Sequence, residues 1–85
     1  MSLGYEARKL RARFSEVKEA FDALSEAVEA CAKALEEAGE DPEKAGEALA
    51  STSRLLEALS RFEHELSHVV ESASSSISLL AALGR

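Results

Sequence analysis

The chain has 85 residues, which makes one small domain near the size at which a single hydrophobic core rarely stabilises a fold without help. One proline and four glycines stand among abundant Ala, Leu, Glu and Ser, a composition that excludes a sheet protein and predicts an all-α fold. The net charge of −6 argues against general nucleic-acid binding, and a single cysteine excludes an internal disulfide framework.

The first predicted element is an amphipathic helix over about residues 4–38. Its apolar residues recur in alternating steps of four and three, the heptad spacing of helices that pack together. They are Leu3, Ala7, Leu10, Phe14, Val17, Phe21, Leu24, Val28, Cys31, Leu35 and Ala38. Charge is uneven along the chain: residues 1–18 have five basic and two acidic side chains, net +3, whereas residues 19–51 have two basic and ten acidic, net −8.

A turn is predicted at residues 39–41. Gly39 is the residue type that most often ends a helix in a left-handed conformation, and Asp41 is a common N-cap. Pro42 suits the first helical position because its missing N–H would have no partner there. No other linker is apparent, so residues 1–85 are expected to form one domain.

The second predicted helix covers about residues 42–83 and repeats the heptad spacing. Its seam residues are Ala45, Ala48, Thr52, Leu55, Leu59, Phe62, Leu66, Val69, Ala73, Ser76, Leu80 and Leu83. A short turn makes two such helices antiparallel neighbours, so we expect a long, coiled-coil-like two-helix hairpin. Matching the two seams places Phe21 opposite Leu59 and a buried Cys31 opposite Ala48.

A further stripe on the second helix predicts self-association. Four apolar residues recur beside the seam, and serines recur every seven residues next to them, where small side chains let another helix approach closely. The predicted dimer interface consists of Leu49, Ser53, Leu56, Ser60, Val70 and Ile77. Because one hairpin seam needs neither feature, we expect a homodimer in the form of a four-helix bundle.

The segment HELSH, residues 64–68, fits the His-Glu-x-x-His pattern of zinc peptidases. The heptad positions of His64 and His68, counted from Leu66, predict that both imidazoles point away from the hairpin core. A zinc peptidase would also need a third ligand and a substrate cleft. The nearest carboxylate outside the motif that could be a third ligand is Glu71, three residues past His68. His64, His68 and Glu71 are therefore weak candidates for adventitious metal binding, and no cofactor is expected.

The same histidine carries a second resemblance. His64-Glu65-Leu66, surrounded by apolar residues, resembles the H-box of sensor histidine kinases, although Ser67-His68-Val69 stands where that family has Arg-Thr-Pro. The resemblance implies a phosphotransfer or dimerisation module in which His64 is the phosphoacceptor.

The simplest interpretation is that both histidines lie on a solvated face, with Glu65 ion-paired to Arg13 across the seam. We therefore expect a non-catalytic oligomerisation or scaffolding module that binds a second copy of itself and an unidentified protein partner. No signal peptide is visible and no apolar run approaches the length that crosses a bilayer, so we expect a cytoplasmic protein without membrane insertion.

Overall fold

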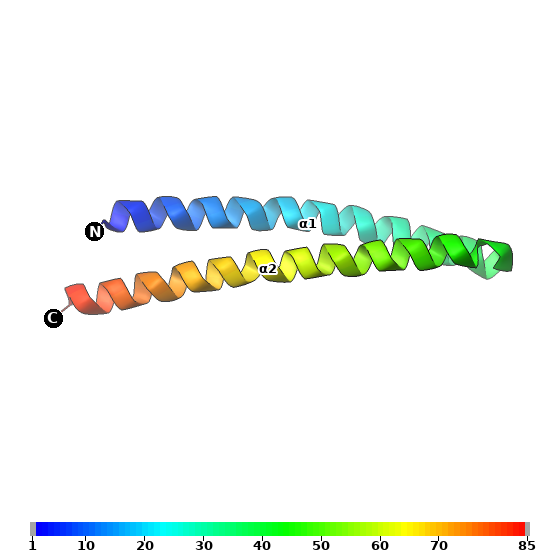
Figure 1. Cartoon of the computed structure of the whole chain (residues 1–85). Helices are drawn as coiled ribbons and strands as arrows, with labels where there is room; N and C mark the ends of the chain where they lie inside the picture. The colour runs from blue at the N-terminus through cyan, green and yellow to red at the C-terminus, as the bar shows by residue number, and fades with distance from the viewer. Residues whose placement is uncertain (1, 85) are drawn as a thin grey trace.

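The computed structural model describes residues 2–84, and nearly all of them are helical. Helix α1 spans Leu3–Glu40, a short 3-10 helix η1 spans Pro42–Lys44, and helix α2 spans Ala45–Leu83. The two long helices lie side by side and antiparallel, with both chain ends at the same end of the molecule (Figure 1). The molecule is a rod of 66 × 15 × 13 Å. The predicted all-α helical hairpin is confirmed.

The turn depends on Asp41 and not on glycine. Asp41 is extended, at φ −135° and ψ 100°, and its Oδ1 accepts a hydrogen bond from the Glu43 N–H at 3.1 Å, so the predicted cap is confirmed. Pro42 occupies the first position of η1. The expected left-handed Gly39 is wrong, because no glycine in the described chain has a positive φ. Helix α1 continues through Gly39 to Glu40, and the extended Asp41 then reverses the chain.

The pairing of the two helices differs from the predicted one by about one helical turn. The rings of Phe21 and Phe62 lie 6.0 Å apart between centroids, and Sγ of Cys31 lies 3.3 Å from Oγ1 of Thr52. The predicted opposites, Leu59 for Phe21 and Ala48 for Cys31, are wrong. The physical reason is that α1 extends past Gly39 and η1 follows, which moves the point of reversal along the chain.

The contact surface is also rotated relative to the predicted seam. Val17, Ala20, Cys31 and Ala48 are the buried apolar residues, with Ser51 and Ser72 as the buried polar ones. On α1, small residues at Ala20, Ala27 and Ala34 are more buried than Phe21, Val28 and Leu35, which the heptad pattern placed in the seam. Facing rows of small residues let helix axes approach closely, because the interaxial distance depends on the side chains at the contact.

This hairpin has a thin core. Among the described residues no large side chain is fully buried. The accessible surface is 6182 Å², whereas a compact 9.1 kDa monomer exposes about 4,900 Å² by size scaling. The expectation that no apolar run approaches the length that crosses a bilayer is wrong, because the segment Pro42–Leu83 is long and apolar enough by length and composition alone. Only 6% of its most apolar stretch is buried. A large part of the apolar surface of the hairpin is therefore uncovered.

Candidate functional site

Most exposed large apolar residues gather on one long side of the hairpin, which we call the apolar face. Helix α1 contributes a row with seven-residue spacing, and α2 contributes two neighbouring rows, because residues seven apart lie on one side of a helix. The rotated contact surface turns all three rows to the same side of the molecule. The apolar face consists of Phe14, Phe21, Val28, Leu35, Leu49, Leu56, Leu59, Leu66, Val70, Ile77 and Leu80.

An open groove crosses the apolar face near its middle. Phe14, Val17 and Phe21 line it from α1, and Phe62 lines it from α2. The ammonium group of Lys18 lies 5.7 Å from the centre of the Phe14 ring at its edge. A second open groove, lined by Leu10, Arg11, Phe14 and Val69, continues toward the chain termini. Both grooves are lined mainly by apolar side chains, with Lys18 and Asp22 also lining the first and Arg11 the second, a composition that suits contact with apolar side chains.

The predicted interface residues on α2 are all exposed. Leu49 is 70% exposed, Leu56 61%, Val70 64% and Ile77 68%. They form one row of the apolar face, and the predicted stripe was only part of this face. Phe14, Phe21, Val28 and Leu35 were assigned to the hairpin seam and instead belong to this surface.

Ser53 and Ser60 are exposed as well. The contact surface of α2 is rotated from the predicted seam by one heptad position around the helix, or roughly 50°. The row of Ser53 and Ser60 therefore lies on the side of α2 that faces away from α1. These serines therefore lie at the outer edge of the apolar face. They were predicted to lie beside the apolar stripe, as small residues that let another helix approach closely.

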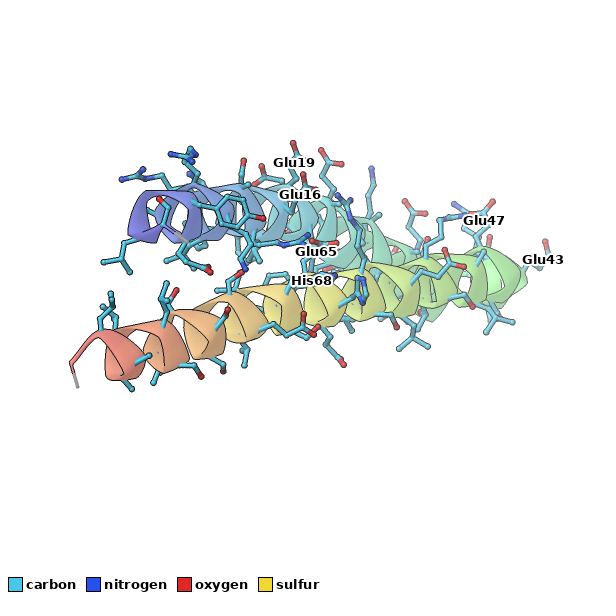
Figure 2. All side chains as sticks on the ribbon, turned by 60° about the vertical axis from the view of Figure 1, so that its left-hand side comes forward. Glu16, Glu19, Glu43, Glu47, Glu65 and His68 are labelled. Atoms are coloured by element: carbon cyan, nitrogen blue, oxygen red, sulfur yellow. The ribbon has the colours of Figure 1, made fainter. Side chains whose placement is uncertain are left out.

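The opposite side of the hairpin is charged. An open groove there is lined by Tyr5, Lys9, Ala12, Arg13, Glu16, Glu65 and His68. Figure 2 shows Glu65 and His68 on α2, with Glu16 and Glu19 on the facing α1. Arg13 and Glu65 share this groove, but the ion pair predicted between them is not formed within residues 2–84, where the ion pairs are Lys9–Glu6 and His68–Glu71. Water in an open groove weakens the attraction that such a pair would gain.

The two histidines converge on α2. Nε2 of His64 and Nε2 of His68 lie 3.1 Å apart, with the rings edge to face at 4.6 Å between centroids. On the other side of the His68 ring, Nδ1 lies 3.5 Å from Oε2 of Glu71. One helical turn separates each residue of this cluster from the next, which is why a single helix brings all three together.

His64 is exposed, as predicted, but His68 is only 26% exposed in its side chain. The prediction that both imidazoles point away from the hairpin was therefore wrong for His68. The rotation of α2 that buries Ser72 also turns His68 toward the charged groove beside α1. Within residues 2–84 no group of three or more His, Cys, Asp or Glu side chains has the geometry to hold a metal ion.

The sequence held a signal for the larger apolar face. Ala20, Ala27 and Ala34 recur every seven residues beside the row that begins with Phe14, and a row of alanines permits a closer helix contact than a row of phenylalanines.

No protein-family model matches the chain, and comparisons with curated proteins and with solved structures also gave no match.

Proposed function

We propose that this protein is a non-catalytic helical-hairpin module that associates with itself through the apolar face and holds protein partners together. The observation that carries the proposal is the apolar face itself, eleven large side chains on one side of a rod with no fully buried large side chain within residues 2–84. Monomeric proteins rarely expose a continuous apolar surface of this extent. A hairpin that is stable only when another chain covers its apolar face would have this exposed surface and this thin core.

The charged opposite face supports the same proposal. It combines exposed Glu, Arg and Lys side chains, as the solvent-facing side of a bundle requires. A four-helix bundle formed from two hairpins buries one side of each helix pair and leaves such a face in water. The remaining exposed surface is then available to a second protein.

The test is the mass in solution. Light scattering of the purified chain at high micromolar concentration should give twice the monomer mass of 9.1 kDa. The double variant Leu56→Glu with Val70→Glu should give the monomer mass, because two carboxylates would have to be buried in an apolar contact. Glu57→Ala, on the neighbouring exposed position, is the matched control and should remain a dimer. A wild-type monomer would contradict the proposed function.

One observation favours a second candidate function, binding of a transition metal by His64 and His68. Their Nε2 atoms are 3.1 Å apart, close to the separation of about 3.3 Å that two ligands at 2.0–2.1 Å subtend at a tetrahedral zinc ion. A carboxylate near Nδ1 of His68 favours the tautomer that leaves a lone pair at Nε2, and Glu71 is placed to do this. Water would supply the other ligands.

Calorimetric titration of the chain with Zn²⁺ or Ni²⁺ tests this candidate. We expect one ion per chain, and His64→Ala or His68→Ala should each remove the binding. Glu71→Gln should weaken it by about ten- to a hundredfold, as loss of a carboxylate behind a metal-bound histidine does. Binding that survives both histidine substitutions would place the ion elsewhere and contradict the assignment.

A further inference from the structure

We infer that the apolar face is covered by a second copy of this chain lying antiparallel, so that the turn of each hairpin sits beside the chain termini of the other. The inference rests on the proposed self-association and adds the orientation of the two copies and the position of their two-fold axis. That axis runs perpendicular to the long dimension of the rod, at the level of Phe21 and Phe62.

The symmetry of one α2 row, the row that contains Leu49, Leu56, Val70 and Ile77, supports this axis. Glu63 stands midway along it, with Leu56 and Val70 seven residues away on either side and Leu49 and Ile77 fourteen residues away. An axis at Glu63 therefore lays Leu49 of one copy beside Ile77 of the other and Leu56 beside Val70. A two-fold axis makes one patch complementary to itself, and a row with this internal symmetry meets that requirement along its whole length.

The same axis crosses the α1 row at Phe21. Phe21 stands between Phe14 and Val28, each seven residues away, and the fourth member of the row, Leu35, then lies opposite Ala7 of the other copy. Across the hairpin, Phe21 contacts Phe62, the residue next to Glu63, with ring centroids 6.0 Å apart. One axis thus passes through the midpoint of the α2 row at Glu63 and through Phe21 of the α1 row. The two Glu63 side chains face each other on this axis, and the apolar contacts on either side of them must exceed the cost of their repulsion.

The charge distribution favours the antiparallel orientation over the parallel one. The half of the hairpin that contains the turn, residues 19–64, has twelve acidic and four basic side chains, net −8. The half that contains the termini, residues 1–18 and 65–85, has four acidic and six basic side chains, net +2. Antiparallel copies place each acidic half beside a basic half, whereas parallel copies place the two acidic halves side by side. Packed hairpins lie about one Debye length apart, about 10 Å, so salt does not fully screen their charges. The electrostatic interaction between the two copies is then attractive in the antiparallel orientation and repulsive in the parallel one.

The exposed area matches a dimer. The chain exposes 6182 Å², about 1,300 Å² more than a compact monomer of its mass. If both copies lose that excess, the interface totals about 2,600 Å², within the range of obligate homodimers. A membrane surface is a poorer occupant, because interfacial helices carry basic residues that attract anionic lipids and this chain has a net charge of −6.

A distance between two identical spin labels tests the orientation. In a Cys31→Ala background, Glu43→Cys places one nitroxide at the turn of each copy. The antiparallel dimer should give a label separation of roughly 55–60 Å by pulsed electron double resonance, from 1.5 Å rise per residue over the path to the axis and back. The control is Ser60→Cys near the axis, which should give a short distance and shows that the labelled chains are paired.

Each result has one meaning. A dimer with turn labels closer than about 30 Å would overturn the orientation while leaving the proposed self-association intact, because turns at one end of a bundle lie one or two helix diameters apart. A monomer by light scattering would overturn both. A monomer that sediments with phosphatidylcholine vesicles would identify lipid as the occupant and likewise overturn the inference.

Discussion

The thiol of Cys31 on α1 lies 3.3 Å from the hydroxyl oxygen of Thr52 on α2. The Thr52 hydroxyl donates its own hydrogen to the carbonyl oxygen of Ala48 at 2.8 Å, so the Cys31 S–H is the donor to Thr52. This contact links the two helices near the turn, where small residues let them lie close together. It also reports the pairing of the helices directly.

The pairing predicts an engineered disulfide. Thr52→Cys should form an intramolecular disulfide with Cys31 on mild oxidation, because the two side chains already touch. Intact mass, which falls by two hydrogens, and faster migration on a non-reducing gel measure it. Ala48→Cys is the matched control, since Ala48 was the partner expected from heptad matching alone. Faster closure with Ala48→Cys than with Thr52→Cys would show that the pairing is wrong.

The burial of Cys31 predicts a slow thiol reaction. Its side chain is almost fully covered, at 4% exposure, so a thiol reagent should react in native buffer much more slowly than in denaturant. The control is Ala32→Cys in a Cys31→Ala background, because position 32 is exposed and should react at the rate of a free thiol. Equal native rates at positions 31 and 32 would contradict the contact surface described for α1.

Gly39 predicts the sign of a stability change. It is helical, lacks a positive φ, and an added Cβ would meet nothing within 4 Å. Gly39→Ala should therefore raise the free energy of unfolding by about 0.5–1 kcal/mol, through lower backbone entropy of the unfolded chain. Gly46→Ala is a matched second site with the same open surroundings. Urea unfolding measures both, and destabilisation by Gly39→Ala would mean a left-handed Gly39 in solution.

The Asp41 cap predicts a loss of stability at the turn. Asp41→Ala removes the acceptor for the Glu43 N–H and should lower the free energy of unfolding by about 1 kcal/mol. Glu40→Ala changes the neighbouring exposed carboxylate and should have a much smaller effect. If the two variants unfold at the same urea concentration, the hydrogen bond to Asp41 does not support the turn.

The histidine cluster predicts a small effect on stability. His64→Ala combined with His68→Ala should change the free energy of unfolding by less than about 0.5 kcal/mol, as substitutions at exposed or half-exposed positions usually do. Thermal unfolding followed by circular dichroism measures the change. A loss of several degrees in Tm without added metal would assign the pair a structural role. Formation of phosphohistidine on His64 with a small phosphodonor would instead support phosphotransfer over the scaffold proposal.

Heptad spacing in the sequence was enough to predict two long helices, their antiparallel order and the position of the turn near Asp41 and Pro42. These features follow from local chemistry, because helix periodicity, caps and the missing N–H of proline act within a few residues. The exposure of Leu49, Leu56, Val70 and Ile77 was also predictable, since no hairpin seam can include a stripe so far around the helix.

The contact surface between the helices could not be predicted from spacing, because α1 offers two adjacent apolar rows, each of which repeats every seven residues. One begins with Ala20 and the other with Phe14, and both satisfy the heptad rule. Close approach of the helix axes buries the alanines and turns the phenylalanines outward, a choice that depends on the side chains of both helices at once. That rotation creates the apolar face, and it turns His68 toward the charged groove while His64 remains in water.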